Sequence, residues 1–162
     1  MTLLAIPADL QPVEPAYRQA LQVKAAAFWV PLFLVALVVD RNVLPGTPIP
    51  TLLLPLLVGL VAFCAIVVAP SRVYRRLGYA IDGRLLRTVR GWLFHTDTIV
   101  PFVRVQHIDV TRGPIDKMFG TASLVVHTAG THNSVVVLPG LAPDRAAEIR
   151  NAIRSEIRAD AE

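Results

Sequence analysis

Two long uncharged stretches near the start of the chain decide which solvent its first third can fold in. Residues 25–39 and residues 51–69 contain no Asp, Glu, Lys, Arg or His, and only the eleven residues 40–50 separate them. The second stretch has 19 residues, close to the roughly 20 that a helix needs to cross a hydrocarbon core of about 30 Å. The pattern predicts a transmembrane hairpin with helices at about residues 21–39 and 51–69.

The first stretch is the shorter of the two, with 15 uncharged residues, or about 22 Å of helix. Leu21 and Val23 lengthen it if the Lys24 ammonium reaches the headgroup layer. A re-entrant or interfacial segment is the alternative interpretation of so short a run. Mixed residues, Asp9 and Glu14 among them, precede the run. The start therefore does not resemble a cleavable secretory signal, and we expect the hairpin to be retained.

Basic residues flank the outer ends of the predicted hairpin more than its connecting loop. Five lie at the ends, and one, Arg41, lies in the loop. The five are Arg18, Lys24, Arg72, Arg75 and Arg76. Since basic residues near membrane ends favour the cytoplasmic side, we expect both termini in the cytoplasm and a multi-pass protein of the cell membrane.

After residue 70 the sequence changes to short stretches typical of β-strands. Asp82-Gly83 is a turn signal between two of them, and Gly113-Pro114 breaks the chain further on. In the last segment Ile149, Ile153 and Ile157 recur every four residues, which predicts an amphipathic helix that packs one stripe on a sheet.

The chain is therefore expected to have three parts. They are an N-terminal cytoplasmic segment at residues 1–20, the hairpin at 21–70, and a cytoplasmic domain at 71–162. The domain is expected to contain six or seven short antiparallel strands followed by one helix, and it is long enough to bury a small core of its own.

Four short motifs follow one another behind the predicted helix pair: Arg104-Val105-Gln106-His107-Ile108, Gly113-Pro114, Phe119-Gly120-Thr121-Ala122 and Thr128-Ala129-Gly130. In this order and spacing the chain resembles bacterial pleckstrin-homology (PH) domain membrane proteins of the YdbS-like family, over roughly Leu21 to Ile157. The Asp82-Gly83-Arg84-Leu85 turn and Arg90-Gly91 match the first hairpin of that family.

The resemblance implies an α+β membrane protein, in which a PH-like antiparallel β-barrel or sandwich follows the transmembrane hairpin and is capped by a C-terminal helix. Members of the family look like binding or assembly modules rather than enzymes, and no ligand residues carry over from them. The expected function is a non-catalytic, membrane-anchored module at the cytoplasmic face of a bacterial membrane, engaging protein partners or anionic lipid. A small accessory subunit of a larger membrane complex, docking through its hairpin, is the alternative.

Basic side chains are the first candidates for lipid or partner binding. Between Arg72 and Lys117 there are nine Lys or Arg against four Asp, and juxtamembrane cations gain about 1 kcal/mol each from anionic headgroups. The candidates are Arg72, Arg75 and Arg76 beside the hairpin, and Arg84, Arg87 and Arg90 on or beside the first strand pair. The alternative is that these residues only set topology and solubility.

Two further groups of residues are candidates for contacts. Trp92, with Leu93 and Phe94, enters the membrane interface if it lies on a loop, and fills the core if it begins a strand. Small residues give the second helix a face that packs closely against another helix, although Ala is also common in membrane helices. These are Gly59, Ala62, Ala65 and Ala69.

Neither a catalytic nor a metal-binding pattern is expected. The four histidines, His95, His107, His127 and His132, have no clustered carboxylates or Cys beside them, although His127 and His132 flank a predicted hairpin turn. Glycine-rich phosphate loops do not occur, and the basic residues are not interleaved with aromatic ones as in a nucleic-acid platform. We expect no cofactor and no nucleic-acid partner. Membrane lipids, other membrane proteins or a second copy of the chain are the expected partners.

Overall fold

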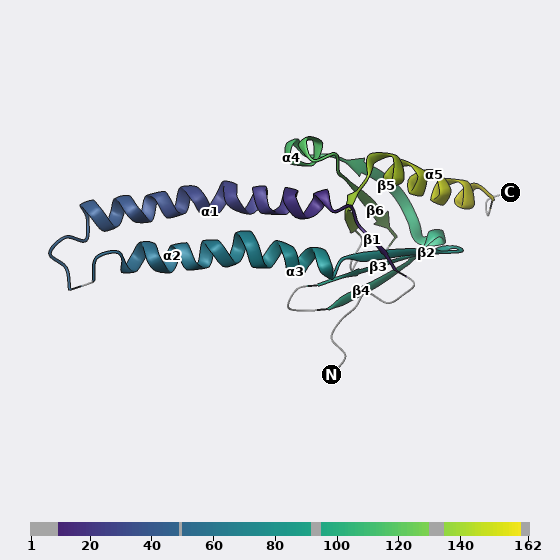
Figure 1. The fold of residues 1–162 in the computed structure, drawn as a ribbon. Coiled ribbons are helices and arrows are strands. Elements are labelled where there is room, and N and C mark those ends of the chain that lie inside the picture. The colour runs from purple at the N-terminus through teal and green to yellow at the C-terminus, as the bar shows by residue number, and fades with distance from the viewer. Residues whose placement is uncertain (1–9, 49, 92–94, 130–134, 160–162) are drawn as a thin grey trace.

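A computed structural model describes residues 10–48, 50–91, 95–129 and 135–159 of the chain (Figure 1). Two long antiparallel helical arms extend from a small domain of β-strands, which carries one helix along its side. The first arm is α1 (Ala16–Asn42). The second arm is a continuous rod of three helical parts, which are α2 (Leu53–Phe63), the π-helical turn η1 (Cys64–Val68) and α3 (Ala69–Arg75).

The outer end of the hairpin is held by a carboxylate. Asp40 lies near the end of α1 and is buried, and both of its carboxylate oxygens accept the Leu52 backbone N–H at 3.1 Å. Leu52 has a positive φ of 70° and is the residue from which α2 starts. The contact therefore fixes the point at which the chain turns back toward the domain.

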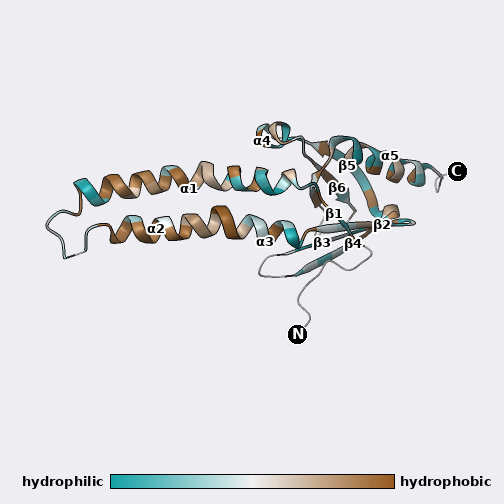
Figure 2. Ribbon diagram, viewed as in Figure 1, coloured by the Kyte–Doolittle hydropathy of each residue, from teal (hydrophilic) through white to brown (hydrophobic). Residues whose placement is uncertain are grey.

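The middle parts of the two arms are mostly hydrophobic, and hydrophilic residues lie mainly near the domain and at the outer end of α1 (Figure 2). Both arms are long and apolar enough to cross a membrane, and only 6% of the apolar window of the first and 17% of that of the second is buried inside the molecule. Leucines of α2 such as Leu56 and Leu60 face outward. A helix of a water-soluble core hides such side chains against protein, so these arms have the surface that a bilayer requires.

The domain contains two antiparallel sheets. The first has the strand order β1-β2-β3-β4, with β1 (Gln11–Pro12), β2 (Gly78–Asp82), β3 (Leu85–Arg90) and β4 (Thr96–Pro101). The second has the order β5-β6-β7, with β5 (Val105–Thr111), β6 (Ala122–Thr128) and β7 (Val135–Leu141). The described part of the domain also contains two short helices, η2 (Phe102–Arg104) and α4 (Pro114–Met118), and one long helix, α5 (Pro143–Ala159).

The core lies between the two sheets and α5. Side chains alternate along β6 and β7, so that Leu124 and Leu138, which are paired in register, both lie fully inside. From α5, Ile149 and Ile153 are buried against them, and Ile157 packs at the edge of the same cluster. The prediction of a C-terminal amphipathic helix on antiparallel sheets is confirmed. The sheets form an open sandwich rather than a closed barrel, since they remain separate in the described part of the chain.

The first helix and the N-terminal segment differ from the prediction. α1 begins at Ala16 rather than near residue 21, because Tyr17 and Ala20 are buried in the domain. Val13 belongs to the same core, and β1 adds a strand to the first sheet within the part that was expected to be a separate segment, residues 1–20. The second rod likewise continues to Arg75, past the predicted end at residue 69.

Candidate functional site

The junction between hairpin and domain is tied together by backbone and ring contacts. The Glu14 N–H donates to the Gly140 carbonyl at 2.8 Å, and the Tyr17 ring lies so close to Gly140 that a Cβ there would be 2.6 Å from its Cγ. Gly140 also has a φ of +77°, which a side chain disfavours. On the other arm, the Tyr74 hydroxyl donates to the Val13 carbonyl at 3.4 Å. Neither arm is joined to the domain by a flexible linker.

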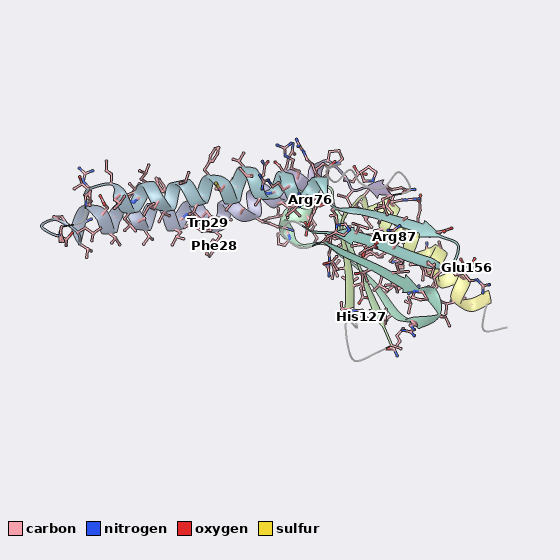
Figure 3. The ribbon with its side chains drawn as sticks, turned by 90° about the horizontal axis from the view of Figure 1, so that it is seen from below. Phe28, Trp29, Arg76, Arg87, His127 and Glu156 are labelled. Atoms are coloured by element: carbon pink, nitrogen blue, oxygen red, sulfur yellow. The ribbon has the colours of Figure 1, made fainter. Side chains whose placement is uncertain are left out.

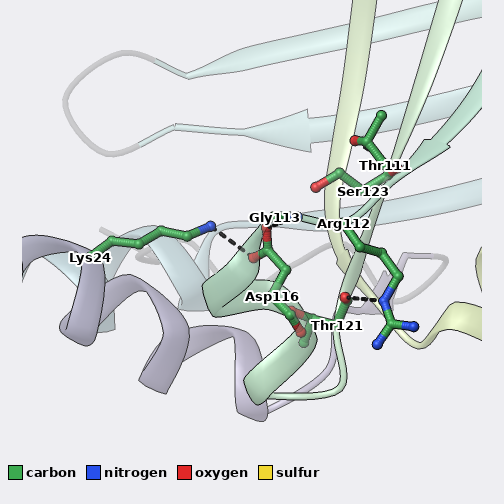
Figure 4. A network of polar contacts seen from close by, with 7 residues as sticks. All are labelled: Lys24, Thr111, Arg112, Gly113, Asp116, Thr121 and Ser123. Atoms are coloured by element: carbon green, nitrogen blue, oxygen red, sulfur yellow. Dashed lines mark hydrogen bonds and ion pairs between the residues drawn. The ribbon is translucent and has the colours of Figure 1, made fainter.

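An ion pair connects the first arm to helix α4 of the domain (Figure 4). Lys24 Nζ lies 2.7 Å from Asp116 Oδ1, although 92 positions separate the two residues in sequence. Asp116 is nearly buried, and its other oxygen accepts the Gly113 N–H at 3.2 Å, which caps the start of α4. α4 is thereby held beside α1 at the level where the apolar run begins.

The junction carries cations and one exposed apolar side chain. Arg72 and Arg75 are exposed on α3, and Lys117 is exposed on α4. Met118, also on α4, is 78% exposed. Arg76, the C-cap residue after α3, lies at the same junction (Figure 3). Three of the predicted basic residues thus lie together at the root of the hairpin.

Two of the other three predicted arginines, Arg84 and Arg87, do not extend that group. Arg84 lies in the turn between β2 and β3, 3.5 Å from Glu156 of α5, and Glu156 is at the end of the domain far from the hairpin (Figure 3). Arg87 on β3 donates to Asp97 of β4 at 2.6 Å, and this hydrogen bond lowers the pKa of Asp97 below its ordinary value. Arg90 is exposed at the end of β3 that lies beside the junction, since its neighbour Val89 pairs with Gly78. The expected continuous basic patch is therefore divided.

The small residues of the second arm face the first arm, at least in its outer half. A Cβ on Gly59 would be 3.1 Å from the Phe33 ring of α1. Ala62 is buried in the hairpin together with Ala36 of α1. Ala65 and Ala69 are partly buried further along the rod. Close helix packing in this region therefore lies within one chain, and large side chains form the outer surface.

Two other expectations concern the loops and the histidines. Trp92, Leu93, Phe94 and His132 lie outside the described residues. His107 and His127 approach Asp109, with Nε2 atoms 3.0 Å and 3.8 Å from its carboxylate oxygens, on the exposed face of β5 and β6. In the described part of the chain, no group of three His, Cys, Asp or Glu side chains is placed to hold a metal ion.

A groove that sequence reasoning did not identify lies between β5 and α5. It has a volume of about 300 Å³ and is lined by residues 105–108 of β5 and by Arg154, Ile157 and Arg158 of α5. The sequence signal for it is a pair of arginines four positions apart on the helix, which places both on one face. The Lys24–Asp116 pair was also missed, since nothing local connects its two partners.

Comparison with known proteins places this architecture in a family. The family model described as "Bacterial PH domain" matches residues 23–157. Over 58 residues the chain is 40% identical to the transmembrane protein YdbS of Bacillus subtilis, which covers 36% of this chain and 35% of that protein. The chain thus aligns with about a third of the length of that curated relative. No solved structure matches the chain significantly. With a family match over most of its length and two apolar helices before an open antiparallel sandwich, the chain belongs to the bacterial PH domain family.

Proposed function

We propose that this chain is a non-catalytic, membrane-anchored binding module. Its two arms span a bacterial cell membrane with both termini in the cytoplasm, and its PH-like domain holds protein partners there while its junction contacts anionic lipid. The observation that carries the proposal is the direct continuation of both arms into the domain. Tyr17 of α1 belongs to the core cluster of the domain, Ala20 one turn further on is fully buried, and only two residues separate α3 from β2.

This attachment supports a position of the domain against the membrane surface. The apolar run of α1 starts immediately after Lys24, and about 12 Å of helix precedes that residue within α1. α4 is tied to α1 at Lys24 itself. The exposed cations Arg72, Arg75 and Lys117 therefore lie at headgroup depth, where each contributes about 1 kcal/mol toward an anionic surface. Met118 beside them offers an apolar contact.

A fluorescence experiment tests the lipid contact. The full chain carries an environment-sensitive dye at Met118→Cys, in a Cys64→Ser background, and is reconstituted into vesicles with and without phosphatidylglycerol. We expect a blue-shifted emission, quenched by headgroup-labelled lipid, that is strongest with phosphatidylglycerol. Arg72→Glu with Arg75→Glu should weaken the shift. The same dye at Asp82→Cys, at the end of β2, is the matched control and should report water throughout.

The orientation has its own test. A reporter enzyme that is active only in the cytoplasm is fused after Glu162, and one active only outside the cytoplasm is fused there in a parallel strain. The proposal requires activity of the first fusion alone. Activity of the second fusion would overturn the cytoplasmic location of the domain, and a water-like dye at residue 118 in all vesicles would overturn the lipid contact.

An accessory subunit that docks through its hairpin is the less favoured function. It was based on a small-residue face of the second helix, and the structure packs Gly59 and Ala62 of that face against α1. The outer surface of the hairpin consists of large side chains, which suit lipid.

A further inference from the structure

The groove between β5 and α5 is built differently from the junction. Its apolar lining comes from Val105, Ile108 and Ile157, and basic side chains border it. It lies beside the C-terminal half of α5, which points away from the hairpin (Figure 1). The Glu156 label in Figure 3 marks the same half of the helix, at the end of the domain far from Arg76. The groove is therefore remote from the membrane.

One side of the groove is a strand edge that no other described strand pairs with. β5 is the outer strand of the second sheet and pairs only with β6 in the described part of the chain. The register shifts between Val105 and His107, but from His107 to Thr111 the pairing is regular. A regular free edge beside an apolar groove is suited to an added strand, whose backbone pairs with the edge while its side chains enter the groove.

The other side of the groove carries two arginines with no partner among the described residues. Arg154 and Arg158 are both exposed, and neither makes a hydrogen bond or ion pair there. Glu156, the acid between them in sequence, contacts Arg84 instead. The other arginines of α5 are engaged, since Arg145 donates to Glu148 at 2.9 Å and Arg150 to Asn151 at 3.3 Å. The free cations of α5 are thus concentrated at the groove.

These features together select a class of partner. We propose that the β5–α5 groove binds an extended acidic segment of a cytoplasmic protein, which pairs with β5 from His107 to Thr111 and places carboxylates on Arg154 and Arg158. Guanidinium groups bind carboxylates through paired hydrogen bonds. A second copy of the chain is disfavoured, since pairing through two β5 edges would bring the same arginines of both copies into one interface. The inference names the partner chemistry for the binding module proposed above and depends on its cytoplasmic location.

Peptide binding to the full chain in detergent micelles tests this inference. The probe is a fluorescein-labelled peptide of seven residues in which valine and glutamate alternate, and the readout is fluorescence anisotropy. We expect saturable binding that weakens at least about tenfold in Arg154→Gln/Arg158→Gln, because two charge-assisted hydrogen bonds are lost. Arg90→Gln/Arg150→Gln removes the same charge outside the groove and should bind like the original chain.

A second set of probes tests strand addition without changing the protein. Successive backbone groups of an added strand point alternately toward and away from β5. N-methylation of one alternate set of peptide amides should therefore abolish binding, and methylation of the other set should leave it within about twofold. Hydrogen exchange of residues 107–111 should slow when the unmethylated peptide binds.

The opposite results would overturn the inference. They are equal binding of a peptide with lysine in place of glutamate, equal effects of both methylated peptides, or equal losses in the two arginine double variants. If phosphatidylglycerol vesicles displace the peptide from Arg154 and Arg158, the groove binds anionic lipid rather than an acidic protein segment. Because peptide binding is measured in micelles, its failure is distinguishable from a wrong orientation, which the reporter fusions measure.

Discussion

The hairpin and the domain dispose their apolar side chains in opposite ways. In the hairpin, leucines such as Leu56, which is 69% exposed, point outward, and small residues face the partner arm. In the domain, Leu86, Leu124 and Leu138 have no exposed surface at all. The comparison teaches that one chain can be folded for two solvents. The domain brings its own core, while the arms depend on lipid for the same purpose.

The hairpin and the domain are not divided at a single position in the sequence. The first turn of α1 belongs to the core of the domain, and α4 of the domain is tied to α1 where the apolar run begins. A movement of the hairpin is therefore transmitted directly to the sheets. This is the physical reason to regard the molecule as an anchored module of fixed orientation rather than a domain on a tether.

The largest expected effect is a difference in unfolding free energy between variants of a buried leucine in the domain and of an exposed leucine in the hairpin. Leu138→Ala removes a fully buried side chain between β7 and α5 and should lower the free energy of unfolding by about 2–5 kcal/mol. Leu56→Ala, at an outward-facing position of α2, should change the stability of the domain by less than about 0.5 kcal/mol. Denaturant unfolding of the full chain in micelles, with hydrogen exchange of the domain as readout, measures both. Similar losses from the two variants would contradict the division.

The next effect lies at the joint between the regions. Gly140→Ala should cost about 1–2 kcal/mol for the left-handed backbone, and moving the Tyr17 ring should add about 1–3 kcal/mol. Gly83→Ala is the matched control, since Gly83 also has a positive φ but a Cβ there meets nothing within 4 Å. Only the Gly140 variant should speed hydrogen exchange in residues 16–23 of α1. Equal exchange in both variants would mean that the ring contact does not hold the arm.

The sequence predicted the membrane hairpin and the β-rich domain, but it did not predict the contacts that join them. Continuous apolar runs identify the hairpin because lipid tolerates no charge along it, and the motif series together with the Ile149, Ile153 and Ile157 spacing identifies the PH-like domain and its last helix. The early start of α1 was missed because Tyr17 and Ala20 are buried in the assembled fold, Tyr17 in contact with Gly140 of β7. Their burial is a property of the assembled fold and leaves no local pattern.

The candidate site shows the same limit. Arg72, Arg75 and Arg76 are neighbours in sequence and remain neighbours in space. Arg84 and Arg87 were grouped with them by charge alone. The register of β2 and β3 places Arg87 opposite Ala80 in the middle of the strand pair, and Arg84 lies in the turn at the end away from the junction. Asp116, the residue that holds α4 to α1, lies 92 positions from Lys24. Local chemistry indicated which residues are basic, and topology decided which of them act together.

A smaller effect is expected at the bridge between α1 and α4. Lys24→Met keeps the apolar stem of the side chain but leaves the nearly buried Asp116 carboxylate without its cation, and should cost about 1–2 kcal/mol. Asp116→Asn should cost a similar amount, and the double variant less than the sum. Lys117→Met, on the same helix but exposed, is the control and should be nearly neutral. Strictly additive losses in unfolding free energy would show that the pair does not couple the arm to the domain.

The smallest effect is confined to the domain and depends on pH. Arg87 lowers the pKa of Asp97 through its hydrogen bond, so the folded pKa lies below the ordinary value of 3.8. A carboxyl group with a lowered folded pKa stabilises the fold above its unfolded pKa, and that contribution is lost as the pH falls through the folded value. Arg87→Gln should therefore cost about 0.5 kcal/mol at pH 7, as expected for a surface pair. The difference in unfolding free energy should stay constant down to about pH 5 and shrink below it.

Carbon NMR of the Asp97 carboxyl should show its pKa rising in Arg87→Gln and unchanged in the control Arg104→Gln. A stability difference that grows toward acid pH would contradict the assigned role of the pair. Because both residues lie on the domain, the Arg87→Gln substitution should leave the hydrogen exchange of α2 unaltered.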